Sequence, residues 1–340
     1  MPTLKHIAIL SGFSVTTVSR ALAGHGDVNP DTRQRIRGIA DEIGYQPNHS
    51  ARQLQGQRTY ALGLIMPPPA HTADDDFFSL LLKGIISKAA SHGYDVVASA
   101  SRSDSIELDT YKRFVAGKRV DGLIVARTYR DDARIRYLQS MNFPFIVHGR
   151  RTPGEISDFP YIDVDSQLGV RMLTEHLIEQ GHQQIGIILP LPSLAFTPYR
   201  LAGYQQALSD HALPYHEHYC THGDLTNVGG RQAAEQLLSS APGLTAIIGC
   251  NDWMALGAQA VVRERGYTVG QDFAVVGYDN IPAAAHAAPP LTTIHQPIYQ
   301  IGEQLTQQLV RLIESEPQAE FPQLLIKPEL VIRGSSGASS

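Results

Sequence analysis

The sequence predicts a small all-α helix-turn-helix domain followed by an α/β body of two doubly wound parallel-sheet subdomains. Helical periodicity with capping residues and glycine turns fills the first 44 residues. From Tyr60 onward, apolar strands alternate with amphipathic helices, which is typical of a parallel sheet. The same alternation restarts near Tyr161, so the body is expected to consist of two similar halves.

The first two helices are predicted by their capping residues. Thr3 can cap a helix that runs through Leu10. Gly12 follows in a short turn, and Ser14 can then cap a second helix over residues 15–22. Helix, glycine turn and helix together form the helix-turn-helix arrangement.

A third helix completes the expected bundle. Asn29 can cap it, Pro30 occupies the first turn where its missing donor costs nothing, and Gly44 ends it. An ordinary three-helix bundle without DNA-binding activity fits the same pattern, so that alternative stays open here.

The outward side of the second helix suits contact with DNA. Its surface is narrow and rich in hydroxyls and carries one guanidinium, so it can enter a major groove and reach base edges. The candidates for reading bases are Val15, Thr16, Thr17 and Arg20. The candidates for contact with the backbone or the minor groove are Thr3, Ser14, Tyr45, Asn48 and Arg52.

Composition restricts the class of protein. At 340 residues the chain is too long for one compact core, and it is 43% apolar without an apolar stretch of membrane length. Its first residues lack the apolar core of a signal peptide. Cys220 and Cys250 are too few for a disulfide framework. We therefore expect a cytoplasmic, nucleoid-associated globular protein with no membrane partner.

The net charge of −5 is unevenly spread. Residues 1–58 carry seven Lys and Arg against four Asp and Glu, a net of +3, which leaves −8 for the remainder. A basic head on an acidic body suits a DNA-binding module joined to a solvated domain. A chance distribution of three charges would give the same values.

Residues 3–58 resemble the LacI family of transcription regulators. The matching positions are Thr3-Leu4, Ile7-Ala8, Gly12, Ser14 to Arg20, Thr32-Arg33, Ile36, Gly44-Tyr45, Pro47-Asn48, Ala51 and Leu54. The resemblance implies a helix-turn-helix domain over residues 1–46 and a hinge helix with its linker over residues 47–58. It places Leu54 at the leucine that the family wedges into the minor groove. Because so short a helix is not stable alone, we expect the hinge to fold only when paired across a dimer on DNA.

The body is expected over residues 59–334, with a disordered tail at residues 335–340. The first subdomain is expected at about 59–160 and 292–322, and the second at about 161–291 and 323–334. Residues 324–332 are expected to return as a single strand.

Ligands of open parallel sheets bind beyond the carboxyl ends of the strands, so two facing sheets would form a cleft lined by strand-end residues. The polar candidates are Arg127, His148, Asn251 and Asp279, with Arg200 at a helix start. Such planar groups can hold sugar hydroxyls by paired hydrogen bonds. The candidates for the apolar face of a ring are Phe77, Phe78, Phe196 and Trp253. For each of these positions, a helix cap or an ordinary surface residue stays an alternative.

The body also resembles the effector domain of the LacI family, which is similar to type I periplasmic sugar-binding proteins. The resemblance is strong at residues 251–257 and 275–280. It implies effector contact by Arg200, Asn251 and Asp279, with Phe77 and Phe78 at ring-contacting positions. Leu194 and Phe196 stand where the purine-responsive member has polar contacts, which argues against a purine corepressor. The absence of a leucine-heptad tail favours a dimer over a tetramer.

One histidine-rich segment could hold a metal. On a continuous strand, His216, His218, Cys220 and His222 would share one face. Ordinary surface histidines on a short strand are the alternative, and we expect no metal or other cofactor.

Together these features predict a homodimeric repressor of carbohydrate-utilisation genes. A small sugar or sugar derivative would close the body and release a palindromic operator. A corepressor that tightens DNA binding, either a nucleobase or a phosphorylated protein partner, stays open as an alternative. No phosphate loop or nucleophile–base constellation is evident, so an enzyme is not expected.

Overall fold

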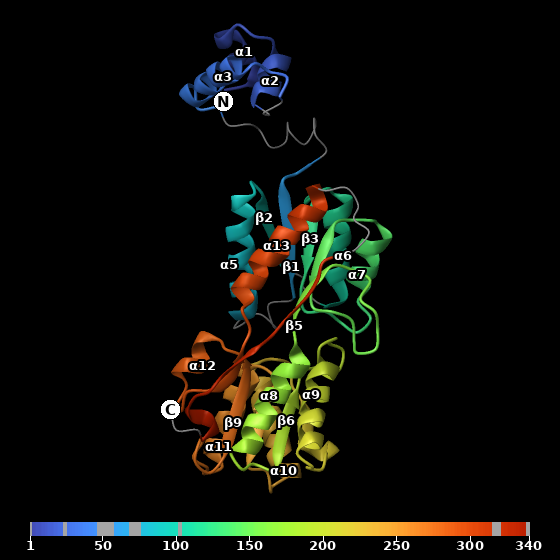
Figure 1. Cartoon of the computed structure of the whole chain (residues 1–340), viewed down its shortest axis with the longest axis vertical. Coiled ribbons are helices and arrows are strands. Elements are labelled where there is room, and N and C mark those ends of the chain that lie inside the picture. Colours follow the sequence, from blue (N-terminus) through green and yellow to red (C-terminus); the bar gives the residue numbers. More distant parts are fainter. Residues whose placement is uncertain are drawn as a thin grey trace. The chain divides into compact units, whose positions relative to one another are not determined.

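The computed structural model describes residues 2–22, 26–45, 58–67, 76–100, 104–314 and 321–337. The chain divides into two compact units, Met1–Thr59 and Tyr60–Ser340 (Figure 1). Residues 47–57 of the expected hinge lie outside the described residues, and with them the candidates Asn48, Arg52 and Leu54.

The first unit is a three-helix bundle. Its helices are α1 (Leu4–Ser11), α2 (Val15–Leu22) and α3 (Pro30–Glu42). They pack around a small core that includes Ile7, Val18 and Ile36. Leu10 is 57% exposed, because the face of α1 that meets the bundle is the one that carries Ile7 and Ser11.

The expected caps of α2 and α3 are confirmed. Ser14 Oγ accepts a hydrogen bond of 3.1 Å from the amide of Thr17, and Asn29 Oδ1 accepts one of 2.9 Å from the amide of Asp31. Gly44 follows α3 with a φ of 63°, a left-handed conformation that glycine adopts without a steric penalty.

The second unit contains two six-stranded sheets. The first has the order β11-β5-β4-β3-β1-β2, and all its strands are parallel. Its strands are β1 (Ala61–Met66), β2 (Asp95–Ala100), β3 (Gly122–Val125), β4 (Phe145–His148), β5 (Tyr161–Val164) and β11 (Gln323–Ile326). Its helices are α5 (Asp76–Ser91), α6 (Asp104–Ala116), α7 (Ala133–Ser140) and α13 (Ile298–Glu314).

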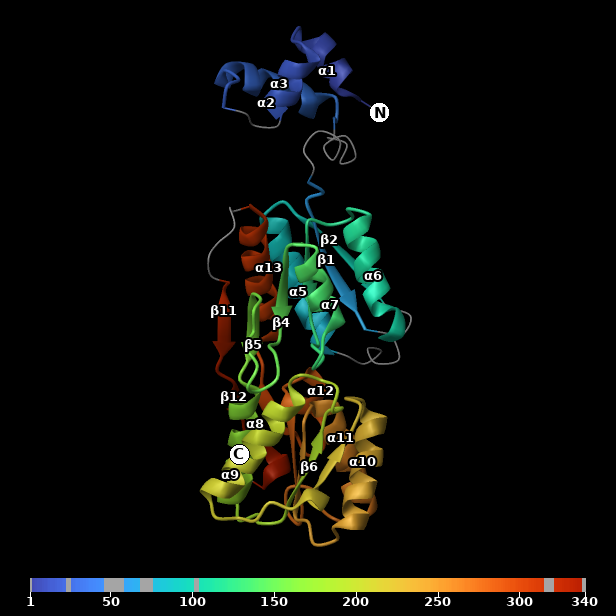
Figure 2. The same cartoon turned by 90° about the vertical axis from the view of Figure 1, so that its right-hand side faces the viewer.

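Helices cover both faces of this first sheet (Figure 2). Successive side chains of β1 point to opposite faces. Leu62 and Leu64 therefore join the core beneath α5 and α13, whereas Ala61 and Ile65 join the core beneath α6 and α7. This double burial explains why β1 is a continuous apolar run in the sequence.

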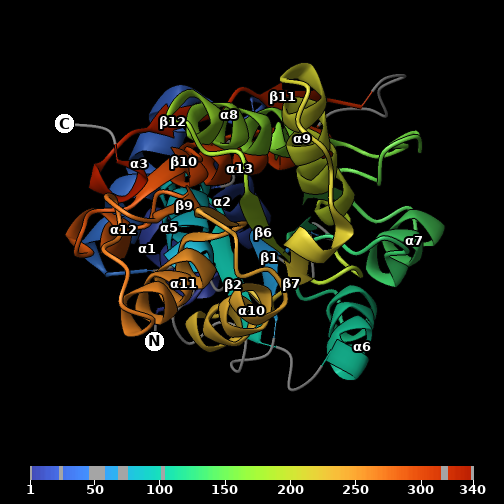
Figure 3. The same ribbon diagram turned by 90° about the horizontal axis from the view of Figure 1, so that it is seen from below.

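The second sheet has the order β12-β10-β9-β8-β6-β7, and only β12 runs antiparallel to its neighbour. Its strands are β6 (Ile185–Leu189), β7 (Cys220–His222), β8 (Ala246–Gly249), β9 (Ala274–Asp279), β10 (Thr292–His295) and β12 (Glu329–Val331). Its helices are α8 (Ser166–Glu179), α9 (Thr197–Asp210), α10 (Asn227–Ser240), α11 (Asp252–Glu264) and the short α12 (Pro282–His286). Viewed from below, α8 and α9 cover one face of the sheet, and α10 and α11 cover the other (Figure 3).

The strands at the subdomain boundaries differ from expectation. β5 was expected to open the second subdomain but belongs to the first sheet, whereas β10 was expected in the first and belongs to the second. Residues 324–332 form two strands, β11 and β12, one in each sheet. Apolar periodicity identifies a buried strand but does not tell which sheet it joins, and Lys327-Pro328 separates the two strands at the crossing.

The tail that was expected to be disordered is partly ordered. A 3₁₀ turn spans Gly334–Ser336, and Ser335 and Ser336 are fully buried. The Ser335 hydroxyl donates to Val275 O at 2.5 Å and accepts from the amide of Thr292 at 2.8 Å. These bonds compensate for burying a polar segment, which composition alone could not reveal. In the described part of the chain, no helix is long and apolar enough to cross a membrane.

Candidate functional site: a polar pocket between the two sheets

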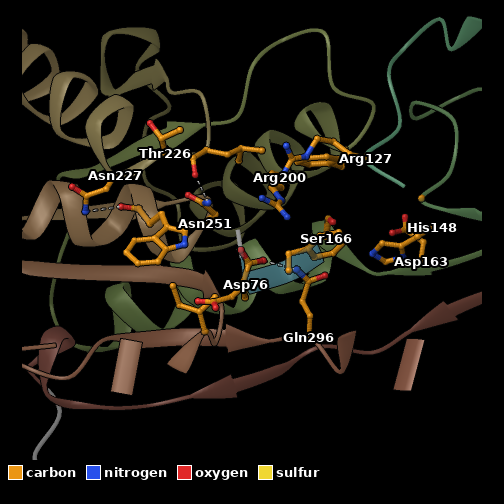
Figure 4. Close-up of a pocket in the computed structure, with 17 residues that line it drawn as sticks. Asp76, Arg127, His148, Asp163, Ser166, Arg200, Thr226, Asn227, Asn251 and Gln296 are labelled. Atoms are coloured by element: carbon orange, nitrogen blue, oxygen red, sulfur yellow. Dashed lines mark hydrogen bonds between the residues drawn. The ribbon is translucent and has the colours of Figure 1, made fainter. Parts of the chain in front are cut away.

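A pocket lies beyond the carboxyl ends of strands from both sheets (Figure 4). It encloses about 980 Å³ with its open mouth included. Eight of the nine expected effector-binding residues line it, namely Phe77, Arg127, His148, Phe196, Arg200, Asn251, Trp253 and Asp279. Four of these eight, Arg127, His148, Asn251 and Asp279, lie at or within two residues of strand ends, as the convergence of strand ends in parallel sheets predicts.

Phe78 is the exception. It is only 2% exposed and packs in the core of the first subdomain, with its ring 5.1 Å from that of Phe77 in an edge-on arrangement. Neighbouring residues on a helix point about 100° apart, so only one of this pair can face the pocket.

Arg200 is held in the pocket by two aromatic rings and one hydrogen bond. Its guanidinium lies 4.6 Å from the ring centre of Phe196 and 4.3 Å from that of Tyr278. Its Nη1 donates to the carbonyl of Cys250, and its buried Nε has no hydrogen-bond partner among the described residues. A buried donor without a partner is costly, and a ligand oxygen would satisfy it.

Asn251 and Trp253 line the pocket at the start of α11. Asn251 is also the cap of this helix, because its Oδ1 accepts from the amide of Met254 at 2.9 Å, and its Nδ2 donates to Leu225 O at 2.8 Å. One amide hydrogen and one lone pair remain for a ligand. Trp253 is the single tryptophan of the chain, and its buried indole N–H has no partner within the described residues.

Asp279 is the last residue of β9, where the chain enters a strained turn. Asp279 and Asn280 have φ values of 123° and 59°, in the left-handed region. The side-chain amide of Gln296 donates from Nε2 to Asp279 Oδ1 at 2.6 Å. Asp252, at the start of α11, lies beneath the turn and is fully buried, and this burial raises its pKa to about 6.

The first sheet contributes the opposite wall. The rings of Phe77 and His148 stack with 5.4 Å between their centres, and His148 Nδ1 lies 2.9 Å from Ile162 O. Burial raises the pKa of Asp163, against the opposing effects of His148 and Arg150.

Sequence reasoning missed several lining residues. They are Asp76, Gly149, Asp163, Ser166, Leu225, Thr226, Asn227, Ile281 and Gln296. Asp163 lies one residue before the end of β5, and Gln296 directly follows β10, so the strand-end rule would have indicated both had the sheet membership of these strands been known.

The histidine-rich segment does not form the expected strand. Residues 217–219 form a 3₁₀ turn, and only Cys220–His222 belong to β7. The turn breaks the alternation that would have aligned the four side chains. Within the described ranges, no cluster of three or more His, Cys, Asp or Glu side chains is arranged to hold a metal.

In the helical head, the expected base-reading face of α2 is open. Val15 is 40% exposed and Thr16 is exposed, while Thr17 Oγ1 lies 2.9 Å from Ser14 Oγ. Arg20 forms a half-exposed ion pair of 2.5 Å with Asp27.

The remaining described candidates of the head lie at its ends. Thr3 precedes α1, and its amide donates to His6 Nδ1 at 3.1 Å. Tyr45 follows α3 and is partly buried against the core of the bundle.

A helix-turn-helix head followed by a ligand pocket between two parallel sheets defines a class, the ligand-responsive DNA-binding regulators. Residues 3–48 match the family model described as bacterial regulatory proteins of the lacI family, and residues 174–336 match that of a periplasmic binding protein-like domain. The chain belongs to the LacI family of bacterial regulatory proteins. It is thus a transcription regulator and not an enzyme.

Relatives match over nearly the whole chain. The regulator CelR of Thermobifida fusca is 33% identical over 335 residues, with 98% of each chain covered. The repressor CytR of Escherichia coli is 32% identical, with 99% of this chain and 96% of that one covered.

Solved structures match in the same way. A CelR–cellobiose complex has a TM-score of 0.77 and 32% identity, covering 98% of this chain and 100% of that one. A lac repressor dimer bound to operator and to the anti-inducer ONPF has a TM-score of 0.84 and 29% identity, with 99% of each chain covered.

Proposed function

We propose that this chain is a homodimeric repressor of carbohydrate-utilisation genes that leaves a near-palindromic operator when a small sugar fills the pocket. The observation that carries this proposal is the pocket itself. It combines planar hydrogen-bonding groups with unpartnered buried donors on Arg200 and Trp253 and with aromatic faces. Such a combination suits a ring that is apolar on its faces and rich in hydroxyls at its edge.

The charges of the pocket favour an uncharged ligand. Its wall carries three carboxylates against two guanidiniums and one imidazole, on Asp76, Asp163, Asp279, Arg127, Arg200 and His148. A phosphorylated sugar would need an excess of cationic donors, which this wall does not supply. A neutral sugar can donate hydroxyl hydrogens to the carboxylates and accept from the guanidiniums.

We propose a disaccharide as the first ligand to test. Aromatic rings lie on both walls, with Phe77 from the first subdomain and Trp253 from the second. Two sugar rings could therefore each find an apolar face. The relative CelR has been solved in complex with cellobiose, which makes cellobiose a natural probe.

We infer that the ligand acts by changing the contact between the subdomains. The subdomains are joined by three crossings of the chain and by a short backbone ladder outside the pocket. In that ladder, the amide of Arg130 donates to Ser193 O and the amide of Ala195 donates to Thr128 O, both at 2.9 Å. A ligand that binds the closed form better shifts the population toward it, and a shift of the first subdomain would separate the paired hinges.

The DNA-binding assignments support the same proposal. Val15, Thr16, Thr17 and Arg20 would read bases, and Thr3, Ser14, Tyr45, Asn48 and Arg52 would contact the backbone or the minor groove. Leu54 keeps the role of the minor-groove wedge that the family resemblance implies. A dimer would place two such heads about one turn of DNA apart. The similar lac repressor has been solved as a dimer bound to operator. Since its target is the chromosome, we propose a nucleoid-associated protein of the cytoplasm.

A ligand screen tests the proposal. Because Trp253 is the only tryptophan and lines the pocket, its fluorescence reports directly on binding. We expect a sugar, with cellobiose tried first, to shift the Trp253 emission and to raise the melting temperature. Trp253→Phe abolishes the signal and serves as the control for the melting shift. A response to nucleobases and to no sugar would overturn the effector assignment and favour a corepressor.

The hinge is tested separately. Leu54→Ala should weaken binding to the specific operator more than binding to random DNA, because a wedge contributes only where the DNA bends. Equal losses on both DNAs would count against the wedge.

A further inference from the structure

The turn that carries Asp279 depends on contacts from distant parts of the chain. Asp279 and Asn280 both have positive φ, which non-glycine residues adopt at a cost. Such strain persists only where the surroundings over-determine it. The contacts that hold this turn therefore decide where the Asp279 carboxylate points.

Five hydrogen bonds hold the turn. Two come from β10, where Thr293 Oγ1 accepts from the backbone amide of Asn280 at 3.4 Å and His295 Nδ1 lies 3.2 Å from Asn280 Nδ2. The other three come from three further directions. The first comes from the pocket wall, where Gln296 Nε2 donates to Asp279 Oδ1 at 2.6 Å. The amide of Ile281 donates to the buried Asp252 at 2.8 Å. The third comes from the C-terminal part of the chain, where Arg333 Nη2 donates to Asn280 Oδ1 at 2.7 Å.

Arg333 is itself firmly held. Its backbone amide donates to Thr292 Oγ1 and its Nη1 donates to Leu291 O, both at 2.8 Å. Two residues later, Ser335 is buried and bonded to β9 through Val275 O. Arg333 is therefore anchored to the same sheet from which the turn projects, while it does not line the pocket.

Ser336 links the same segment to two further elements, β10 and α8. Its hydroxyl lies 2.8 Å from Thr292 Oγ1 and 2.9 Å from His176 Nε2 on α8. The segment Arg333–Ser336 thus connects the turn to β10 and α8, and none of its four residues is exposed.

We propose that Arg333 is a positioning residue for effector binding. By holding Asn280, it fixes the strained turn in the conformation that presents the Asp279 carboxylate to the pocket. The C-terminal segment Arg333–Ser336 thereby sets the affinity of the pocket without touching the effector. This inference rests on the proposed function of the pocket as the effector site.

Three variants and one control test it in the full chain. Arg333→Gln removes the guanidinium. Asn280→Gly removes the side-chain oxygen that accepts its hydrogen bond. Because glycine adopts a positive φ without a steric penalty, Asn280→Gly is expected to fold even if Arg333→Gln does not. The double variant measures whether the two residues act together. Arg263→Gln is the matched control, because Arg263 Nη1 donates to Ala288 O, which lies outside the turn.

Two readouts separate this inference from the proposed function. The first is hydrogen exchange of the amides of residues 277–284 without ligand. Arg333→Gln and Asn280→Gly should each accelerate it, and Arg263→Gln should not. The second is the affinity for cellobiose from Trp253 fluorescence, which each single variant should weaken about tenfold. The double variant should be no weaker than either single variant, and operator affinity without sugar should be unchanged.

Unchanged exchange in Arg333→Gln, or additive losses of affinity in the double variant, would overturn the inference. If cellobiose does not bind the unaltered chain, that result counts against the proposed ligand, and the exchange measurement alone decides whether Arg333 holds the turn.

Discussion

The guanidinium of Arg200 lies 4.3 Å from the ring centre of Tyr278, so a cation of the pocket rests on a residue of the core. Tyr278 is fully buried, and Gly169 on α8 makes room for it, since a Cβ there would lie 2.7 Å from the ring. Phe196 approaches the same guanidinium at 4.6 Å. Arg200 is thus fixed before any ligand arrives, and such preorganisation reduces the entropic cost of binding.

The first prediction concerns this planar cation. Arg200→Lys replaces a planar guanidinium, which stacks on two rings and offers several donors, by a single ammonium. We therefore expect the affinity for the sugar to fall at least about tenfold. Titration of the Trp253 fluorescence measures it. Arg171→Lys on α8 is the matched control, because Arg171 pairs with Glu175 at a partly exposed position. Equal affinities in wild type and Arg200→Lys would show that Arg200 does not contact the ligand.

The second prediction concerns a buried charge network in the first subdomain. Arg134 pairs with Glu107 at 2.5 Å and with Asp132 at 2.6 Å, and all three side chains are at most 5% exposed. Arg134→Met leaves two buried carboxylates without their cation, so the free energy of unfolding should fall by about 3–5 kcal/mol. Urea unfolding measures this change.

The control for that network is an exposed ion pair between α7 and the residues just before it. Arg136 pairs with Asp131, and their side chains are 51% and 83% exposed. Arg136→Met should change the stability by less than about 1 kcal/mol. Similar losses in both variants would contradict the importance of burial.

The third prediction is a pH dependence from Asp252. Its pKa is raised to about 6 by burial, so the folded state keeps a proton that the unfolded state has already lost. This contribution is fully present below about pH 4 and is lost as the pH rises through 6, on the order of 1–3 kcal/mol. Asp252→Asn should flatten the fall in stability between pH 4 and 7. Asp131→Asn, at an exposed carboxylate, is the control, and an unchanged slope in Asp252→Asn would contradict the assignment.

The fourth prediction separates two roles of Ser14. Ser14→Ala removes the cap of α2 and should destabilise the head by about 1 kcal/mol. Ser14→Asp restores a cap, because its carboxylate can accept from the Thr17 amide, yet it places a negative charge where DNA phosphates approach. We expect this variant to keep the melting temperature and to lose operator affinity. Full operator affinity in Ser14→Asp would place Ser14 away from the DNA.

Much of this arrangement follows from local physical rules. Ser14 and Asn29 were recognisable as caps because their side chains satisfy free amides within two or three residues. His148, Asn251 and Asp279 were recognisable because parallel strands bring their carboxyl ends together.

What escaped prediction depends on contacts between distant segments. Phe77 and Phe78 are the same residue type at adjacent positions, and only the orientation of α5 decides which of the two rings faces the pocket. Gln296 lines the pocket because β10 joins the second sheet, which apolar periodicity does not reveal. Ser335 is buried because its hydroxyl donates a hydrogen bond to Val275 O, 60 residues away in sequence, although the composition of the tail suggested disorder.

The most direct test of the account is the affinity of the full chain for its operator, selected from random DNA and measured at one fixed salt concentration, with and without sugar. We predict that a sugar that shifts the Trp253 emission also weakens operator binding at least about tenfold, with the same half-saturating concentration. Operator affinity that stays the same at saturation with every bound sugar would contradict it.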